Sequence, residues 1–217
     1  MEKHHALEEE RVQFQVDRVA FFSDAVIAIA ITLLILEIKI PPFGKQTTLK
    51  DLPRHFDTHT ELSLLGMLVC FYFIGNLWIR HHELYQHVRN YNKQLVRTNL
   101  YFLLTIMIMP LSTSIAMDED NPAFIAQAVF FFNMGLCYLA YYWLLWVIFH
   151  HKNQFSTLAD KQKIRGMKWQ TLGIALILVV IAVLAAFGYQ RFFVFVAIIP
   201  VARRLWGRWK GRVSSLP

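Results

Sequence analysis

Asp24 is the residue of this sequence whose chemistry contrasts most with its surroundings. It lies near the start of an apolar stretch, RVAFFSDAVIAIAITLLILEIK, which runs from Arg18 to Lys39 and is long enough to cross a bilayer. An ionisable side chain inside a membrane costs several kcal/mol, so it usually pairs with other polar groups or takes part in proton or ion movement. Asp24, with Ser23 beside it, is therefore the first candidate for a functional group.

Asp24 needs partners from outside its own helix. Arg18 is six residues away, so on a helix the two side chains point about 120° apart and cannot form an ordinary pair four residues apart. At a matching depth the second apolar stretch ends in GNLWIRHH, and Asn99 lies near the start of the third. The candidates in that GNLWIRHH segment are Asn76, Trp78, His81 and His82. We expect a network between helices that either locks the first helix in place or lets Asp24 or His81 gate or sense protons.

Beyond Asp24 the first stretch is aliphatic except for Thr32. On a helical wheel one face collects Ala25, Ile29, Thr32, Leu33 and Leu36. In a single bundle this face is core. In a symmetric assembly several copies can surround one axis, where apolar side chains exclude water and a hydroxyl replaces part of an ion's hydration. The residues alone leave core and pore open.

The composition indicates an all-α membrane protein. Of the 217 residues 56% are hydrophobic and only 17% are charged, which is too little charge for a soluble domain of this length. Pro110 falls inside an apolar stretch and predicts a kink. We expect a single transmembrane domain over 1–217 with six helices, the last of them the shortest. Their approximate ranges are 19–40, 61–84, 97–117, 123–149, 167–188 and 190–206.

The basic residues predict the orientation of these helices. With the N-terminus in the cytoplasm, 17 of the 22 Lys and Arg residues fall on the cytoplasmic side. That excess favours an N-in, C-in protein with six spans. The net charge of +7 is then mainly a topology signal rather than a footprint for nucleic acid, and the basic C-terminal tail is expected on anionic lipid headgroups.

Histidine and cysteine do not predict a metal centre. His55 and His59 fall on the outer side, whereas the pairs at 81–82 and 150–151 face the cytoplasm, and no carboxylate completes a ligand set. Cys70 and Cys137 lie mid-span and are expected to be buried small hydrophobes. No phosphate loop, nucleophile elbow or catalytic dyad is present, so we expect no enzyme activity and no cofactor.

Three short segments resemble the transmembrane protein 175 family, potassium channels known from lysosomes and bacteria. Arg18-x-x-x-Phe22-Ser23-Asp24 matches the RxxxFSD signature of that family. The LWIxHH segment at 77–82 and the RTNL segment at 97–100 resemble its second and third helices. The resemblance covers the first half of the chain by motif and the second half by topology.

The resemblance implies a potassium-preferring cation channel with K⁺ as its permeant ion. A chain with one six-helix repeat is similar to the bacterial branch, which implies a homotetramer around four first helices in the inner (plasma) membrane. The family's narrowest ring lies five residues after the signature aspartate, at Ile29 here, and the pore continues past Leu33 and Leu36. Thr32 corresponds to a threonine linked to potassium preference, and modest selectivity over Na⁺ is expected. The signature residues Arg18, Phe22, Ser23 and Asp24 are expected to hold the helices together.

Two other functions follow less well from the sequence. A secondary transporter usually shows inverted repeats and broken helices near a midplane site, and neither is visible in this sequence. A membrane metalloenzyme conflicts with the distribution of histidines on both sides of the bilayer. The partners we expect are further copies of the chain, membrane lipids and monovalent cations, with no nucleic acid.

Overall fold

Every regular element of the described part of the chain is a helix. The computed structural model describes residues 2–38, 58–118, 120–150 and 160–189. The elements are α1 (Glu2–Leu33), the 3₁₀ turn η1 (Leu34–Glu37), α3 (Thr58–Tyr85), α4 (Lys93–Met107), α5 (Met109–Met117), α6 (Ala123–Ile148) and α7 (Lys161–Ala186).

Five helical segments of the described residues are long and apolar enough to cross a membrane. They are Glu10–Glu37, Ser63–Tyr85, Lys93–Met117, Ala123–Ile148 and Lys161–Ala186. These segments fall in the same parts of the chain as the first five expected spans. The sixth expected span, 190–206, lies outside the described residues.

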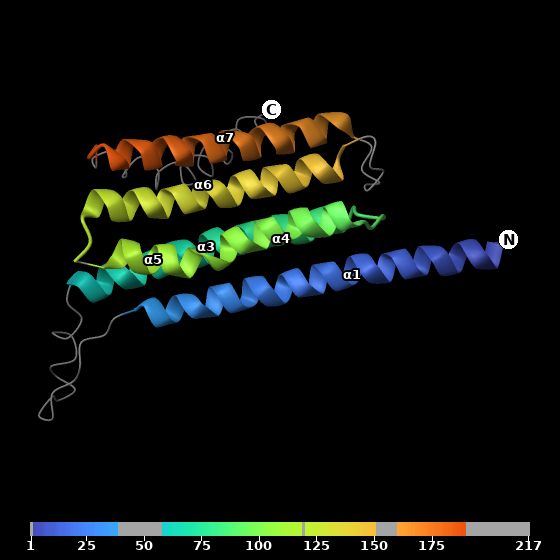
Figure 1. Ribbon diagram of the computed structural model, residues 1–217, viewed down its shortest axis with the longest axis horizontal. Coiled ribbons are helices and arrows are strands. Elements are labelled where there is room, and N and C mark those ends of the chain that lie inside the picture. Colours follow the sequence, from blue (N-terminus) through green and yellow to red (C-terminus); the bar gives the residue numbers. More distant parts are fainter. Residues whose placement is uncertain (1, 39–57, 119, 151–159, 190–217) are drawn as a thin grey trace, which may run out of the picture.

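The helices form a layered bundle with α1 at one edge. α1 packs against α3, α4 and α5, while α6 packs against α4, α5 and most extensively α7. The α3–α5 layer therefore separates α1 from the α6–α7 pair, and the N-terminal part of α1 extends past the other helices (Figure 1). The C-terminal end of α3 and the N-terminal ends of α4 and α7 lie at the end of the bundle from which α1 extends (Figure 1). We call this the N-terminal end of the bundle.

Side-chain caps start two of the helices at this end. The Asn92 side chain accepts a hydrogen bond from the Leu95 backbone N–H at 2.9 Å, which caps α4. The Asp160 carboxylate accepts from the backbone N–H groups of Gln162 and Lys163 at 2.9 and 3.0 Å, which caps α7. Each cap satisfies backbone donors that the first helical turn leaves without a partner.

The third span is interrupted where the sequence predicts a kink. α4 ends at Met107 and α5 begins at Met109, with Pro110 in its first turn. Proline lacks the N–H that would continue the helical ladder. The flanking hydrogen bonds from Ile108 N to Leu104 O (3.3 Å) and from Ser112 N to Ile108 O (3.0 Å) keep the two segments joined. The result is a bent span and not an unwound one.

Both cysteines are buried, as expected, and both make weak polar contacts with the kinked span. Cys70 Sγ lies 3.1 Å from Thr113 Oγ1, and Cys137 Sγ donates to the Thr105 carbonyl at 3.4 Å. These contacts belong to the packing of α3 and α6 against α4 and α5.

The close pairing of α6 with α7 depends on Gly135. A Cβ atom at this position would lie 2.9 Å from Val179 Cγ2 and 3.4 Å from the Val179 backbone nitrogen. Small residues allow helix backbones to approach within a membrane, where packing rather than water exclusion drives association.

Gly135→Ala should therefore destabilise the α6–α7 pair by about 1–3 kcal/mol through overpacking. Gly173→Ala is the matched control, because nothing lies within 4 Å of a Cβ atom added to Gly173 of α7. Thermal unfolding of the detergent-purified protein, followed by tryptophan fluorescence, should show a lower midpoint for Gly135→Ala only. An equal shift for both variants would contradict the close approach.

Candidate functional site

α1 has a packed face and an exposed face along its membrane-spanning half. Val16, Ser23, Ile27, Ala30 and Leu34 are buried, with spacings of three, four and seven residues that keep them on one side of a helix. This packed face contacts the α3–α5 layer.

The exposed face is the one predicted as a candidate pore lining. Ile29 is 59% exposed, Leu33 41% and Leu36 73%, whereas their neighbours Ile27 and Leu34 are only 1% exposed. Ala25 and Thr32 are exposed on the same side. The described part of the bundle therefore leaves these side chains uncovered, and an exposed apolar surface of this kind marks a site of contact with lipid or protein.

Two local features shape this exposed face. The Thr32 hydroxyl donates to the Ile29 carbonyl at 2.8 Å, so its oxygen keeps its lone pairs for an outside donor or a cation. The 3₁₀ turn η1 follows directly, and side chains three residues apart are eclipsed in that geometry. Leu33 and Leu36 consequently extend the face in line with Ile29.

A buried chain of hydrogen bonds joins the packed face of α1 to α4 and α3. The Ser23 hydroxyl donates to the Val19 carbonyl at 2.7 Å and accepts from the Asn99 amide nitrogen at 2.8 Å. The Asn99 amide oxygen lies 2.9 Å from His81 Nε2. Ser23, His81 and Asn99 are each at most 1% exposed. We call the hydrogen bonds among Ser23, Asn99 and His81, together with the Asp24–Trp78 bond described next, the α1 anchor.

Asp24 completes the anchor with a bond of its own to α3. Trp78 Nε1 donates to Asp24 Oδ1 at 2.7 Å, which joins adjacent residues of α1 to two different helices. A charge-assisted bond of this length offsets part of the cost of holding a carboxylate at membrane depth.

The geometry also fixes the tautomer of His81. Because the Ser23 hydroxyl proton is directed to Val19, its oxygen must accept from Asn99, so the Asn99 amide oxygen faces His81. An amide oxygen only accepts, so His81 carries a proton on Nε2. The ring is stacked on Phe102 at 5.4 Å and on Tyr85 at 4.4 Å, measured between ring centroids. His81 is held as a rigid donor.

Not every residue predicted for this network takes part in it. The Asn76 amide donates to the Tyr72 carbonyl of its own helix at 2.6 Å and lines a cleft beside α6 and α7. It stands two residues before Trp78, so it points about 200° around α3 from the Asp24 contact. His82 is exposed and lies beside Trp78, with ring centroids 5.9 Å apart. Tyr85 and Phe102, which clamp His81, were absent from the sequence prediction.

Arg18 and Phe22 of the signature lie outside the anchor. Both are exposed on α1. Their spacing places them on the same stripe as Ala25 and Ile29, so the exposed face continues from the apolar stretch back through the signature. Among the described residues, no group of three or more His, Cys, Asp or Glu side chains gathers to hold a metal ion.

Comparison with known proteins decides the family. A sequence model described as "Endosomal/lysosomal potassium channel TMEM175" matches residues 18–110, which contain the signature and the whole anchor. A potassium channel of Streptomyces collinus is 31% identical over 154 residues, which make up 70% of this chain and 73% of that protein. The chain belongs to the TMEM175 family.

Two further similar proteins give a consistent result. A potassium channel of a Chryseobacterium species is 32% identical over 96 residues, covering 44% of this chain and 46% of the relative. The fold matches the crystal structure of a lysosomal potassium-selective channel TMEM175 homolog from Chamaesiphon minutus with a TM-score of 0.53 at 24% identity. That match covers 83% of this chain and 97% of the other, and it shows that the two share a fold.

Replacing Asn99 tests the anchor. Asn99→Leu removes both of its side-chain bonds, which leaves the buried His81 nitrogen without a partner and the Ser23 oxygen without the donor it accepts from. An orphaned buried group costs about 1–3 kcal/mol, and the lost bond to Ser23 adds to that, so the unfolding midpoint in detergent should fall. Gln94→Leu, which removes an amide from a half-buried position of the same helix, should change the midpoint little. Equal stability of wild type and Asn99→Leu would contradict the anchor.

Proposed function

We propose that this chain is a subunit of a potassium-preferring cation channel in which several copies place the exposed face of α1 around a common axis. The observation that best supports this proposal is that α1 has two different sides. One side is held to α3 and α4 by hydrogen bonds, and the other, with Ile29, Thr32, Leu33 and Leu36, is exposed. Membership of the TMEM175 family supports this proposal, as do relatives named as potassium channels. We infer four copies, as the resemblance of this one-repeat chain to the bacterial branch implies, in the bacterial inner membrane, with six spans and both termini inside.

The proposed barrier is a ring of Ile29 side chains. Apolar rings narrow enough to expel water block ions, because the ion must shed its hydration with nothing in return. Leu33 and Leu36 extend the apolar lining by two further levels. A small outward movement or rotation of α1 would widen and wet this constriction.

The proposed contribution of Thr32 is partial replacement of hydration. Its hydroxyl proton is held by the Ile29 carbonyl at 2.8 Å, which turns the oxygen outward as an acceptor. One ring of hydroxyls coordinates an ion less completely than a cage of carbonyls, so modest preference for K⁺ over Na⁺ follows. Potassium is the permeant ion in this proposal, and no cofactor, metal or enzymatic step enters it.

The anchor gives these positions their direction. Ser23 and Asp24 lie six and five residues before Ile29, less than two helical turns away. A rotation of α1 by one residue would turn the exposed face by about 100°, so the hydrogen bonds to Trp78 and Asn99 set which residues face the axis.

Ile29→Asn should give a leaky channel with reduced preference for K⁺, because an amide ring keeps water in the constriction. Currents are measured after reconstitution into planar bilayers. Leu68→Asn is the control, since it adds the same amide at an exposed position of α3, outside the exposed face of α1. Unchanged currents for Ile29→Asn would show that the constriction lies at other residues.

Thr32→Val keeps the shape of the side chain and removes its oxygen. The permeability ratio of K⁺ to Na⁺, taken from reversal potentials under mixed gradients, should fall toward one while conduction persists. A ratio equal to that of wild type would show that Thr32 does not contact the ion. Saturable flux that requires a second ion would instead favour a secondary transporter.

A further inference from the structure

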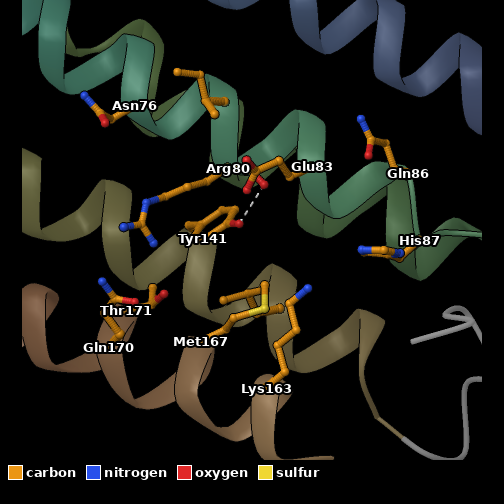
Figure 2. A pocket seen from close by; sticks show the side chains of 12 residues that line it. Asn76, Arg80, Glu83, Gln86, His87, Tyr141, Lys163, Met167, Gln170 and Thr171 are labelled. Atoms are coloured by element: carbon orange, nitrogen blue, oxygen red, sulfur yellow. Dashed lines mark hydrogen bonds between the residues drawn. The ribbon is translucent and has the colours of Figure 1, made fainter. Parts of the chain in front are cut away.

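A polar cleft lies on the side of α3 away from α1, between α3, α6 and α7. Its volume is about 590 Å³, which falls in the range of small-ligand sites. Figure 2 shows side chains entering it from α3 on one side and from α7 on the other, with Tyr141 of α6 between them. The cleft shares no residue with the α1 anchor and is separate from the exposed face of α1.

Two cations of the cleft have no anionic partner. Arg80 of α3 and Lys163 of α7 both line it, and neither forms an ion pair or side-chain hydrogen bond with another described residue. The Tyr141 hydroxyl donates to the backbone carbonyl of Arg80 at 2.9 Å, which fixes the local backbone and leaves the guanidinium unpaired. Glu83 is the carboxylate at the cleft, so two fixed positive charges face one negative charge.

The inner wall holds a hydroxyl with no hydrogen-bond partner. Thr171 is fully buried and lines the cleft, yet its Oγ1 bonds to no other described residue. Buried polar atoms without a partner are uncommon and require an explanation, which a polar ligand in the cleft would supply for Thr171. Gln86 and Gln170 add neutral amide donors to the same space.

The position of the cleft matches the depth of lipid headgroups. Arg80 stands five residues before the end of α3, and Lys163 is in the first turn of α7, so both lie near the ends of segments able to span a membrane. These ends meet at the N-terminal end of the bundle, where the sequence concentrates its basic residues (Figure 1). Basic pockets between helices at this depth suit anionic lipid headgroups.

We propose that this cleft binds the phosphate group of an anionic phospholipid headgroup. Arg80 and Lys163 supply the charge, Thr171 and the glutamine amides supply neutral hydrogen bonds, and the acyl chains remain in the bilayer. Glu83 disfavours dianions and leaves a site suited to a singly charged phosphodiester. The binding needs no current through the protein, so its outcome is independent of the proposed channel function.

The test is native mass spectrometry of the full-length protein in detergent, titrated with dioleoyl phosphatidylglycerol. Dioleoylglycerol, which lacks the phosphate, and inorganic phosphate are titrated in parallel. The variants are Arg80→Gln/Lys163→Gln and Thr171→Val, the second of which keeps the shape of the buried side chain. Arg89→Gln/Lys93→Gln is the matched control, since it removes two exposed charges at the same end of the bundle and outside the cleft.

Wild type should bind phosphatidylglycerol and not dioleoylglycerol. The Kd for phosphatidylglycerol should rise about tenfold or more in Arg80→Gln/Lys163→Gln and about threefold in Thr171→Val, and stay unchanged in the control. Equal affinity in all variants, or no binding of phosphatidylglycerol to wild type, would overturn the proposal. Binding of inorganic phosphate alone, with the same dependence on Arg80 and Lys163, would show that the ligand is free phosphate and not a lipid.

Discussion

The hydrogen bonds that Ser23 and Asp24 accept from Asn99 and Trp78 determine how α1 is rotated against the rest of the bundle. Within a bilayer the transfer of an apolar side chain from lipid to a helix interface releases little free energy. Apolar packing alone therefore favours one rotation of a helix over another only weakly. A polar group without a partner is costly there, and only one rotation of α1 satisfies Ser23, Asp24 and Asn99 together. This constraint therefore decides which side of α1 remains uncovered.

The anchor is stable because each of its members is itself held. Ser23 is tied to its own helix through Val19, and the His81 ring is stacked between Tyr85 and Phe102. Asn99 bridges the two with one amide, using its nitrogen toward α1 and its oxygen toward α3. Replacing Ser23, Asn99 or His81 leaves at least one buried group without its partner, so these three residues depend on one another.

Much of this arrangement is predictable from the sequence, for physical reasons that differ by residue. Asp24 has no partner on its own helix. The segment that holds Trp78 is expected at the same depth in the membrane, so it is the predicted source of a partner for Asp24. Helical periodicity places Ile29, Thr32, Leu33 and Leu36 on one face, although only the structure shows that this face is uncovered. The bend follows from Pro110. The resemblance to the family follows from a short signature, and the family model and a relative named as a potassium channel support it.

Other features need the three-dimensional arrangement. Asn76 has the right type and depth for the anchor, but which way a residue of α3 points depends on how that helix is rotated, so it faces the cleft instead. His81 of α3 stacks on Phe102 of α4. No motif in the sequence predicts how these two helices are aligned against each other, so this contact could not be predicted. The cleft itself combines Arg80, Lys163 and Thr171 from segments distant in sequence, and none of them stands out in its own stretch.

The reversal potential of the wild-type protein is the sharpest test of the proposed pore. Purified protein is fused into a planar bilayer with a high K⁺ concentration on one side and a high Na⁺ concentration on the other. A potassium-preferring pore should give a steady current, without any coupling ion, that reverses between zero and the potassium equilibrium potential. No current, or a flux that requires a second ion, would contradict it and return Ile29, Leu33 and Leu36 to the role of packing or lipid-facing residues.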